Sequence, residues 1–225
     1  MSPRFTRGSS GRKRRLARGV VLSTRPKRRP SARPGTVTTE VTAGLTPIER
    51  NLGLQWVAAT VLGWLVGFVV CEALKRLLAS VLGTDGLVIG TAIGIAQWLV
   101  LRRQIAPTRW WVFASIIGFG VGKAVGEAVV HGFPTVIGAG LTGAVIGLSL
   151  GVAQWLVLRH YVSRAGWWVP ATILAWGIGW SVISLVEDVA DQSTPVVYVV
   201  GATGAAVAGI ITALTLIRLR RPGPV

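Results

Sequence analysis

The sequence contains few of the residues from which most enzymatic and metal-binding sites are built. Among 225 residues there are one cysteine, one methionine, two histidines and eight acidic residues. The single cysteine, Cys71, excludes a disulfide within the chain. Both histidines lie far from it, so we expect no zinc site. No HExxH motif, nucleophile elbow or pair of catalytic carboxylates is present, and the sequence therefore predicts a protein without enzymatic activity, cofactor or metal.

Apolar residues, glycine and tryptophan are abundant instead. Hydrophobic residues make up 51% of the chain, the mean hydropathy is +0.59, and there are 29 glycines and 10 tryptophans. This composition is typical of a multi-pass membrane protein. Strict alternation of apolar and polar residues is absent, which argues against a transmembrane barrel.

Six apolar runs follow one another after residue 50. A helix needs about 20 residues to cross the hydrocarbon core, with a range of roughly 17–25. All six runs meet this length, the second only just. We therefore predict an all-α membrane protein with six transmembrane helices. The runs are residues 52–73, 86–102, 110–130, 135–158, 167–187 and 195–217.

Most of the positive charge lies in an N-terminal segment. Residues 1–50 hold 13 of the 24 basic residues and two acidic ones, a formal charge of +11 (13 − 2), whereas the remainder carries +5 (11 − 6). We expect residues 1–48, rich in Arg, Pro, Ser and Gly, to form a disordered tail. Three interpretations remain open: an arm that binds anionic lipid, a nucleic-acid or ribosome contact, or a segment absent from the mature protein. The last would follow from a start placed too far upstream or from a transit peptide.

We expect no cleavable signal sequence, because the first long apolar run begins near Leu54. Since the basicity belongs mainly to the tail, a nucleic-acid partner is not expected for the chain as a whole.

A long motif occurs twice. Residues 94–102 and 151–159 both read Gly-x-Ala-Gln-Trp-Leu-Val-Leu-Arg, 57 residues apart (154 − 97), and each is followed by Trp-Trp-Val. A third entry segment begins at Trp56. A third exit segment, residues 209–218, has decayed, with Thr212 and Ala213 in place of Gln and Trp. We predict three tandem helical hairpins, 52–102, 110–159 and 167–218, within a membrane domain of residues 49–221.

Small residues recur four apart in every predicted helix. Examples are Gly63 and Gly67 in the first run and Gly118, Gly122 and Gly126 in the third. In lipid, apolar side chains gain little from helix association, so close backbone packing over small residues decides it. Six such stripes predict a tightly packed bundle and argue mildly against a wide aqueous pore.

The charge asymmetry of the connections predicts orientation. Arginines gather at the end that holds both termini, and acidic residues gather at the other end. The positive-inside rule therefore predicts a protein of the inner cell membrane with both termini in the cytoplasm. Tryptophan favours the interface because its ring is apolar and its N–H needs a wet partner. The predicted interface anchors are Trp98, Trp155, Trp110, Trp111, Trp167, Trp168, Arg102 and Arg159.

Five polar side chains form the candidate intramembrane site. Gln97 and Gln154 lie inside the apolar zone. Each either bonds a neighbouring helix, through Ser115 or Thr172, or lines a solute path. Lys123 lies inside an apolar run with Glu127 four residues later, and Glu72 is the repeat equivalent of Glu127. These charges form either a structural pair near the outer interface or a site for a polar solute or proton.

The motif Ala-Gln-Trp-Leu-Val-Leu-Arg, followed by Trp-Trp-Val-x-Ala, resembles a group of small, glycine-rich bacterial membrane proteins found among cyanobacteria and filamentous phototrophs. The resemblance covers roughly residues 52–218 and leaves out the tail. It implies a fold type and a bacterial membrane, and no activity.

Three function classes follow in order. The first is a non-enzymatic structural or partner-binding protein, with the lipid bilayer and an unknown protein or a second copy as partners. The second is a small-solute or ion conduit. A membrane-embedded enzyme comes third. Convergence of Gln97, Gln154, Lys123 and Glu127 on one cavity would favour the conduit, and their dispersal would favour the first class.

Overall fold

The computed structural model describes residues 45–78, 85–104, 109–130, 133, 135–187 and 194–221. These residues form six α-helices and one short 3₁₀ helix, with no strand among them, so the predicted all-helical fold is confirmed. Apart from residues 45–48, the predicted tail lies outside the described residues. The helices are α1 (Pro47–Leu78), α2 (Asp85–Leu101), α3 (Trp110–Val129), α4 (Thr135–Leu158), η1 (Ala165–Trp167), α5 (Trp168–Glu187) and α6 (Thr194–Arg220).

Five of these helices are long and apolar enough to cross a membrane, which fits a multi-pass membrane protein. The remaining one, α2, is equally apolar in character but has 17 residues. The five candidate spans are Pro47–Arg76, Trp110–Val129, Thr135–Leu158, Ala165–Val186 and Val196–Arg220.

The start of α1 is fixed by a capping box. Thr46 Oγ1 accepts a hydrogen bond from the backbone N–H of Glu49 at 3.2 Å, and the Glu49 carboxylate accepts one from the Thr46 N–H at 2.8 Å. Pro47 stands at the first helical position, where its missing N–H has no cost. The helix therefore begins two residues before the predicted domain boundary at residue 49.

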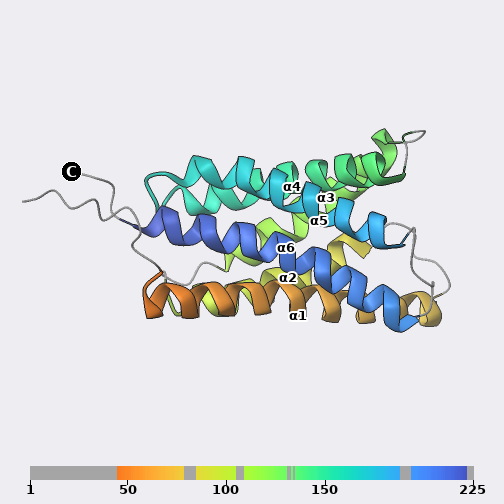
Figure 1. Cartoon of the computed structure of the whole chain (residues 1–225), viewed down its shortest axis with the longest axis horizontal. Coiled ribbons are helices and arrows are strands. Elements are labelled where there is room, and N and C mark those ends of the chain that lie inside the picture. The colour runs from red at the N-terminus through yellow and green to blue at the C-terminus, as the bar shows by residue number, and fades with distance from the viewer. Residues whose placement is uncertain are drawn as a thin grey trace, which may run out of the picture. The chain divides into compact units, whose positions relative to one another are not determined.

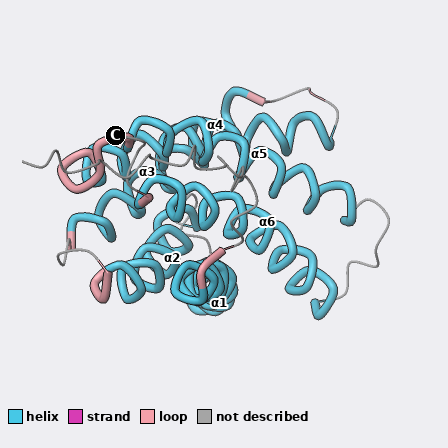
Figure 2. The backbone as a smooth tube through the Cα atoms, turned by 60° about the vertical axis from the view of Figure 1, so that its left-hand side comes forward, coloured by secondary structure: helices cyan, strands magenta, loops and turns pink. Residues whose placement is uncertain are grey.

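Each helix packs against its neighbours in sequence, and α6 also packs against α1, so the helices form a closed ring. Figure 1 shows their axes running along the same direction, and Figure 2 shows α1 nearly end-on beside α2 and α6. The ring is tied at one end by an ion pair, in which Arg221 Nε lies 2.6 Å from Glu49 Oε1. The start of α1 and the end of α6 therefore lie at the same end of the bundle.

Glycines allow the backbones within each helix pair to touch. A Cβ added to Gly63 of α1 would lie 2.6 Å from the Ile93 Cα atom of α2. A Cβ added to Gly118 of α3 would lie 2.6 Å from the Leu150 Cα atom of α4. Both distances are shorter than any real side-chain contact with a backbone carbon, so a larger residue at either glycine would push the helices apart.

Candidate functional site

Three tryptophans meet in the interior near the end of the ring that carries the Glu49–Arg221 pair. Trp56, Trp111 and Trp168 come from α1, α3 and α5, and none is more than 1% exposed. Their ring centroids lie 5.8–5.9 Å apart with interplanar angles of 65–83°. This mutual edge-to-face geometry is the favoured one for aromatic pairs. We call these three residues the tryptophan cluster.

Two buried glutamines supply the partners of two of these indoles. Trp111 Nε1 donates to Gln97 Oε1 at 3.2 Å, and Trp168 Nε1 donates to Gln154 Oε1 at 2.9 Å. Each amide then donates to the helix before it: Gln97 to Thr60 Oγ1 at 3.1 Å and Gln154 to Ser115 Oγ at 3.0 Å. Each glutamine therefore joins three successive helices, and its polar atoms are satisfied by neighbours.

The third indole is held by a different residue. Trp56 Nε1 donates to Thr212 Oγ1 of α6 at 3.0 Å. Unlike the two glutamines, Thr212 has no amide N–H that it could donate to the helix before it, α5. Thr172 of α5 donates its hydroxyl to the backbone carbonyls of Trp168 and Val169. The decayed exit segment therefore keeps the acceptor that Trp56 needs and loses the second bond.

Aromatic side chains continue below the tryptophan cluster. Phe119 and Trp176 are buried and lie edge-to-face with centroids 5.1 Å apart. Trp64 is 6% exposed and belongs to the same apolar core. Aromatic side chains therefore fill the interior at this level of the bundle.

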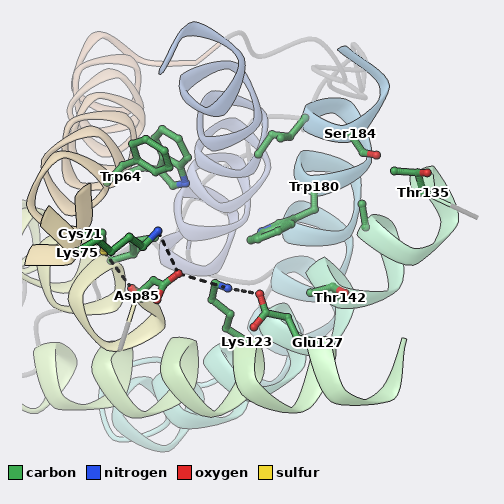
Figure 3. Close-up of a pocket in the computed structure, with 14 residues that line it drawn as sticks. Trp64, Cys71, Lys75, Asp85, Lys123, Glu127, Thr135, Thr142, Trp180 and Ser184 are labelled. Carbon is green, nitrogen blue, oxygen red and sulfur yellow. Dashed lines mark hydrogen bonds and ion pairs between the residues drawn. The ribbon is translucent and has the colours of Figure 1, made fainter. Parts of the chain in front are cut away.

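The opposite end of the bundle contains a cavity of about 400 Å³, which we call the charged cavity (Figure 3). Five helices, α1 to α5, contribute residues to its wall, which combines aromatic rings with charged side chains. Its lining residues are Trp64, Phe68, Cys71, Lys75, Asp85, Ile89, Lys123, Glu127, Thr135, Ala139, Thr142, Trp180, Ile183 and Ser184.

A chain of ion pairs crosses one side of the cavity. The Lys123 ammonium pairs with the Glu127 carboxylate and lies 3.9 Å from Asp85 Oδ2. Lys75 Nζ lies 3.8 Å from the same Asp85 oxygen and 3.1 Å from Glu72 Oε1. The Lys123 side chain is only 15% exposed, whereas those of Lys75 and Glu127 are more than half exposed. The pairs join the ends of α1 and α3 to the first turn of α2.

Across the cavity from these charges, α5 presents two buried polar atoms. Trp180 Nε1 and Ser184 Oγ have no hydrogen-bond partner among the described residues. In Figure 3 the Trp180 indole extends from α5 into the cavity, opposite Asp85 and Lys123. A buried polar group without a partner costs roughly 1–3 kcal/mol. Both atoms are buried in these positions, so the two side chains would have to rotate to meet an incoming polar group, which would then recover this cost.

The predicted site residues do not converge. Gln97 and Gln154 lie beside the tryptophan cluster, whereas Lys123 and Glu127 line the charged cavity. Along α3, Trp111 and Lys123 are 12 residues apart (123 − 111), roughly 18 Å at about 1.5 Å per residue. Glu72 does not line the cavity and connects to it through Lys75.

Sequence reasoning missed Asp85, Trp180 and Ser184 as site residues. Asp85 opens α2 and bridges two lysines. The sequence does contain a signal for Asp85: it stands directly before an apolar run, at the end of the bundle where the acidic residues gather. The two α5 residues gave no signal, because a Trp and a Ser in an apolar helix are ordinary core residues.

The predicted interface anchors divide into three groups. Trp110 and Trp167 are on the outside of the bundle, 64% and 69% exposed. Trp98 and Trp155 are partly buried, with the guanidinium carbons of Arg102 and Arg159 lying 5.1 Å and 5.4 Å from their ring centroids. The third group, Trp111 and Trp168, faces the interior of the bundle. Both rings are 1% exposed, since buried glutamine oxygens replace the water that their N–H groups would otherwise need.

Among the residues that the structure describes, no group of three or more His, Cys, Asp and Glu side chains could hold a metal ion. Comparison of the chain with protein-family models, curated proteins and solved structures finds no match.

Proposed function

We propose that this chain is a non-enzymatic, partner-binding membrane protein that receives a polar group of its partner in the charged cavity. The observation that carries the proposal is the contrast between the two ends of the bundle. One end is filled by the tryptophan cluster and its hydrogen bonds, whereas the other holds a cavity whose largely apolar wall carries charged side chains. A bundle built in this way can bind at one end and does not conduct.

The proposal includes six spans arranged as three tandem hairpins. In support of it, the glycine contacts of α1 with α2 are repeated by α3 with α4, and Gln97 and Gln154 make the same bonds. The 17 residues of α2 rise about 26 Å, somewhat less than the roughly 30 Å hydrocarbon core. Asp85 at its start and Arg102, directly after its end, can reach the interfaces with small adjustments of the bilayer.

We further propose that the tryptophan cluster lies toward the cytoplasm of a bacterial inner membrane, with both termini on that side. The arginines that follow α2, α4 and α6 are the support for this orientation. The charged cavity then opens away from the cytoplasm, and the partner reaches it from outside or from within the membrane.

A polar partner fits the cavity for two reasons. Trp180 Nε1 and Ser184 Oγ offer a donor and a hydroxyl without partners among the described residues, and the facing ion pairs offer both signs of charge. The aromatic walls from Trp64 and Phe68 can cover the apolar part of the same partner.

Protection of a cysteine at the cavity tests the proposal. Thr135 is exposed and lines the cavity, so Thr135→Cys combined with Cys71→Ala places the only thiol there. We expect slow reaction with N-ethylmaleimide in native membranes, where the partner is bound, and fast reaction after purification in detergent. A matched thiol at the exposed Arg103 at the other end should react equally in both. Equal rates at Thr135→Cys would contradict partner binding in the cavity.

The second candidate is the conduit. It is favoured by the gathering of Lys123, Asp85 and Glu127 at one cavity, but the tryptophan cluster would have to open for a solute to pass. Proteoliposomes containing the protein distinguish the two functions. We expect potassium and glycerol fluxes equal to those of empty liposomes. A flux that Lys123→Met abolishes would instead establish the conduit.

A further inference from the structure

A groove runs along the outer face of α5 and α6 at the end that holds the tryptophan cluster. Its volume is about 460 Å³. Arg164 and Trp167, from the connection between α4 and α5, line one part of it, and Arg218 of α6 lines the part facing them. The groove lies at the opposite end of the bundle from the charged cavity, and binding in it is independent of the function proposed for that cavity.

The two arginines are available to a ligand. Among the described residues, neither Arg164 nor Arg218 forms an ion pair, and both are exposed. Other arginines at this end are engaged: Arg102 and Arg159 lie over indoles, and Arg221 binds Glu49. The groove therefore presents two positive charges with no counter-charge among the described residues, a demand that an anion would meet.

Below the arginines the groove becomes apolar. Leu174 lies seven residues beyond Trp167 on the chain, and Ile211 lies seven residues before Arg218. At about 1.5 Å per residue, each is roughly 10 Å deeper in the membrane than the arginine level. Ala171 and Thr215 lie between the two levels, and their small side chains leave the space that forms the groove. One end of the groove thus suits an anion and the other suits a hydrocarbon chain.

We propose that this groove binds an anionic phospholipid, with its phosphate between Arg164 and Arg218 and one acyl chain along Leu174 and Ile211. The exposed indole of Trp167 lies at the headgroup level, where tryptophan is favoured. Basic pockets between helices at a membrane surface have the chemistry to hold anionic headgroups, because each arginine near the surface contributes attraction.

Native mass spectrometry of the full chain, delipidated in detergent, tests the site. The probes are phosphatidylglycerol, phosphatidylcholine with identical acyl chains, and glycerol 3-phosphate. We expect phosphatidylglycerol to bind in preference to the other two. The double variant R164Q/R218Q should bind it about 30-fold more weakly, since two contributions of about 1 kcal/mol each multiply at 1.4 kcal/mol per tenfold.

Two further variants separate the groove from general charge. R103Q/R109Q removes two exposed arginines at the same end but outside the groove, and should bind phosphatidylglycerol like the native chain. Ala171→Phe fills the hollow while keeping both arginines, and should also lose binding. Near-ultraviolet circular dichroism of the tryptophan cluster confirms that each variant is folded.

The proposal fails if R103Q/R109Q weakens binding as much as R164Q/R218Q, because the charge would then act without the groove. Equal binding of phosphatidylcholine would remove the role of the arginines. Binding of glycerol 3-phosphate as tight as that of the lipid, or full binding by folded Ala171→Phe, would remove the role of the apolar part.

Discussion

Replacing Gln154 with methionine removes a buried amide and keeps an unbranched side chain of similar length. Two interhelical hydrogen bonds are lost: the one accepted from Trp168 Nε1 at 2.9 Å and the one donated to Ser115 Oγ at 3.0 Å. Ser115 keeps its bond to the Trp111 carbonyl at 2.9 Å, so its hydroxyl stays satisfied. The Trp168 N–H, by contrast, is left without an acceptor in the interior.

The structure sets the expected size of this effect. An interhelical hydrogen bond in a membrane protein contributes roughly 0.6–2 kcal/mol, and a buried donor left unpaired costs about 1–3 kcal/mol. We therefore expect Gln154→Met to lower the free energy of unfolding by about 2 kcal/mol. Thr212→Val removes one interhelical bond, at 3.0 Å, and likewise leaves a buried indole N–H, that of Trp56, without an acceptor, so it should cost somewhat less than Gln154→Met.

The measurement is reversible unfolding in mixed micelles of mild detergent and dodecyl sulfate. The coupled indoles of the tryptophan cluster should give a near-ultraviolet circular dichroism signal that is lost on unfolding. Thr203→Val is the matched control, because the Thr203 hydroxyl is exposed and bonds only the Val199 carbonyl of its own helix at 2.9 Å. We expect this control to change stability by less than about 0.5 kcal/mol.

One result would refute the reasoning. If Gln154→Met and Thr203→Val had the same stability, the bonds of the buried amide would contribute nothing to the bundle. The glutamine would then be free for another role, such as lining a solute path, and the conduit would gain support.

Two further predictions concern packing and the ion pairs. Gly118→Ala should destabilise the bundle by more than about 1 kcal/mol in the same unfolding assay, because its Cβ would lie 2.6 Å from the Leu150 Cα atom. Gly166→Ala, which meets no atom within 4 Å, is its control, and equal stability of the two would contradict the glycine-packing argument. Lys123→Met should destabilise more than Glu127→Gln, since the lysine side chain is 15% exposed and separates two carboxylates, whereas that of Glu127 is 55% exposed. If Glu127→Gln destabilised the protein more than Lys123→Met in the dodecyl sulfate unfolding assay, the buried lysine would not be the residue on which the ion pairs depend.

The helices were predictable because the physical signal for each is long and redundant. Runs of about 20 apolar residues and glycines four apart both indicate the same structure. The partners of the two glutamines were half predictable. Ser115 was an expected acceptor for a glutamine and serves Gln154, but Gln97 uses Thr60, which the sequence did not suggest.

What escaped prediction depends on which residues of distant helices meet. A tryptophan next to a connection is usually an interface residue, and only the placement of Gln97 and Gln154 turns Trp111 and Trp168 inward. Likewise, the charged cavity needs α5 to stand opposite α2 and α3, which no local pattern encodes. The contacts between side chains of different helices were therefore the part of the site that the sequence did not reveal.

The bond between Trp56 and Thr212 spans 156 residues and joins the first helix to the last. During synthesis, the indole at the start of α1 thus has no acceptor until the final helix has entered the membrane. A chain arrested after α5 would be left with a gap in its ring and an unmatched N–H facing lipid. The helix made last is thus the one that both closes the ring and satisfies a buried indole of the helix made first.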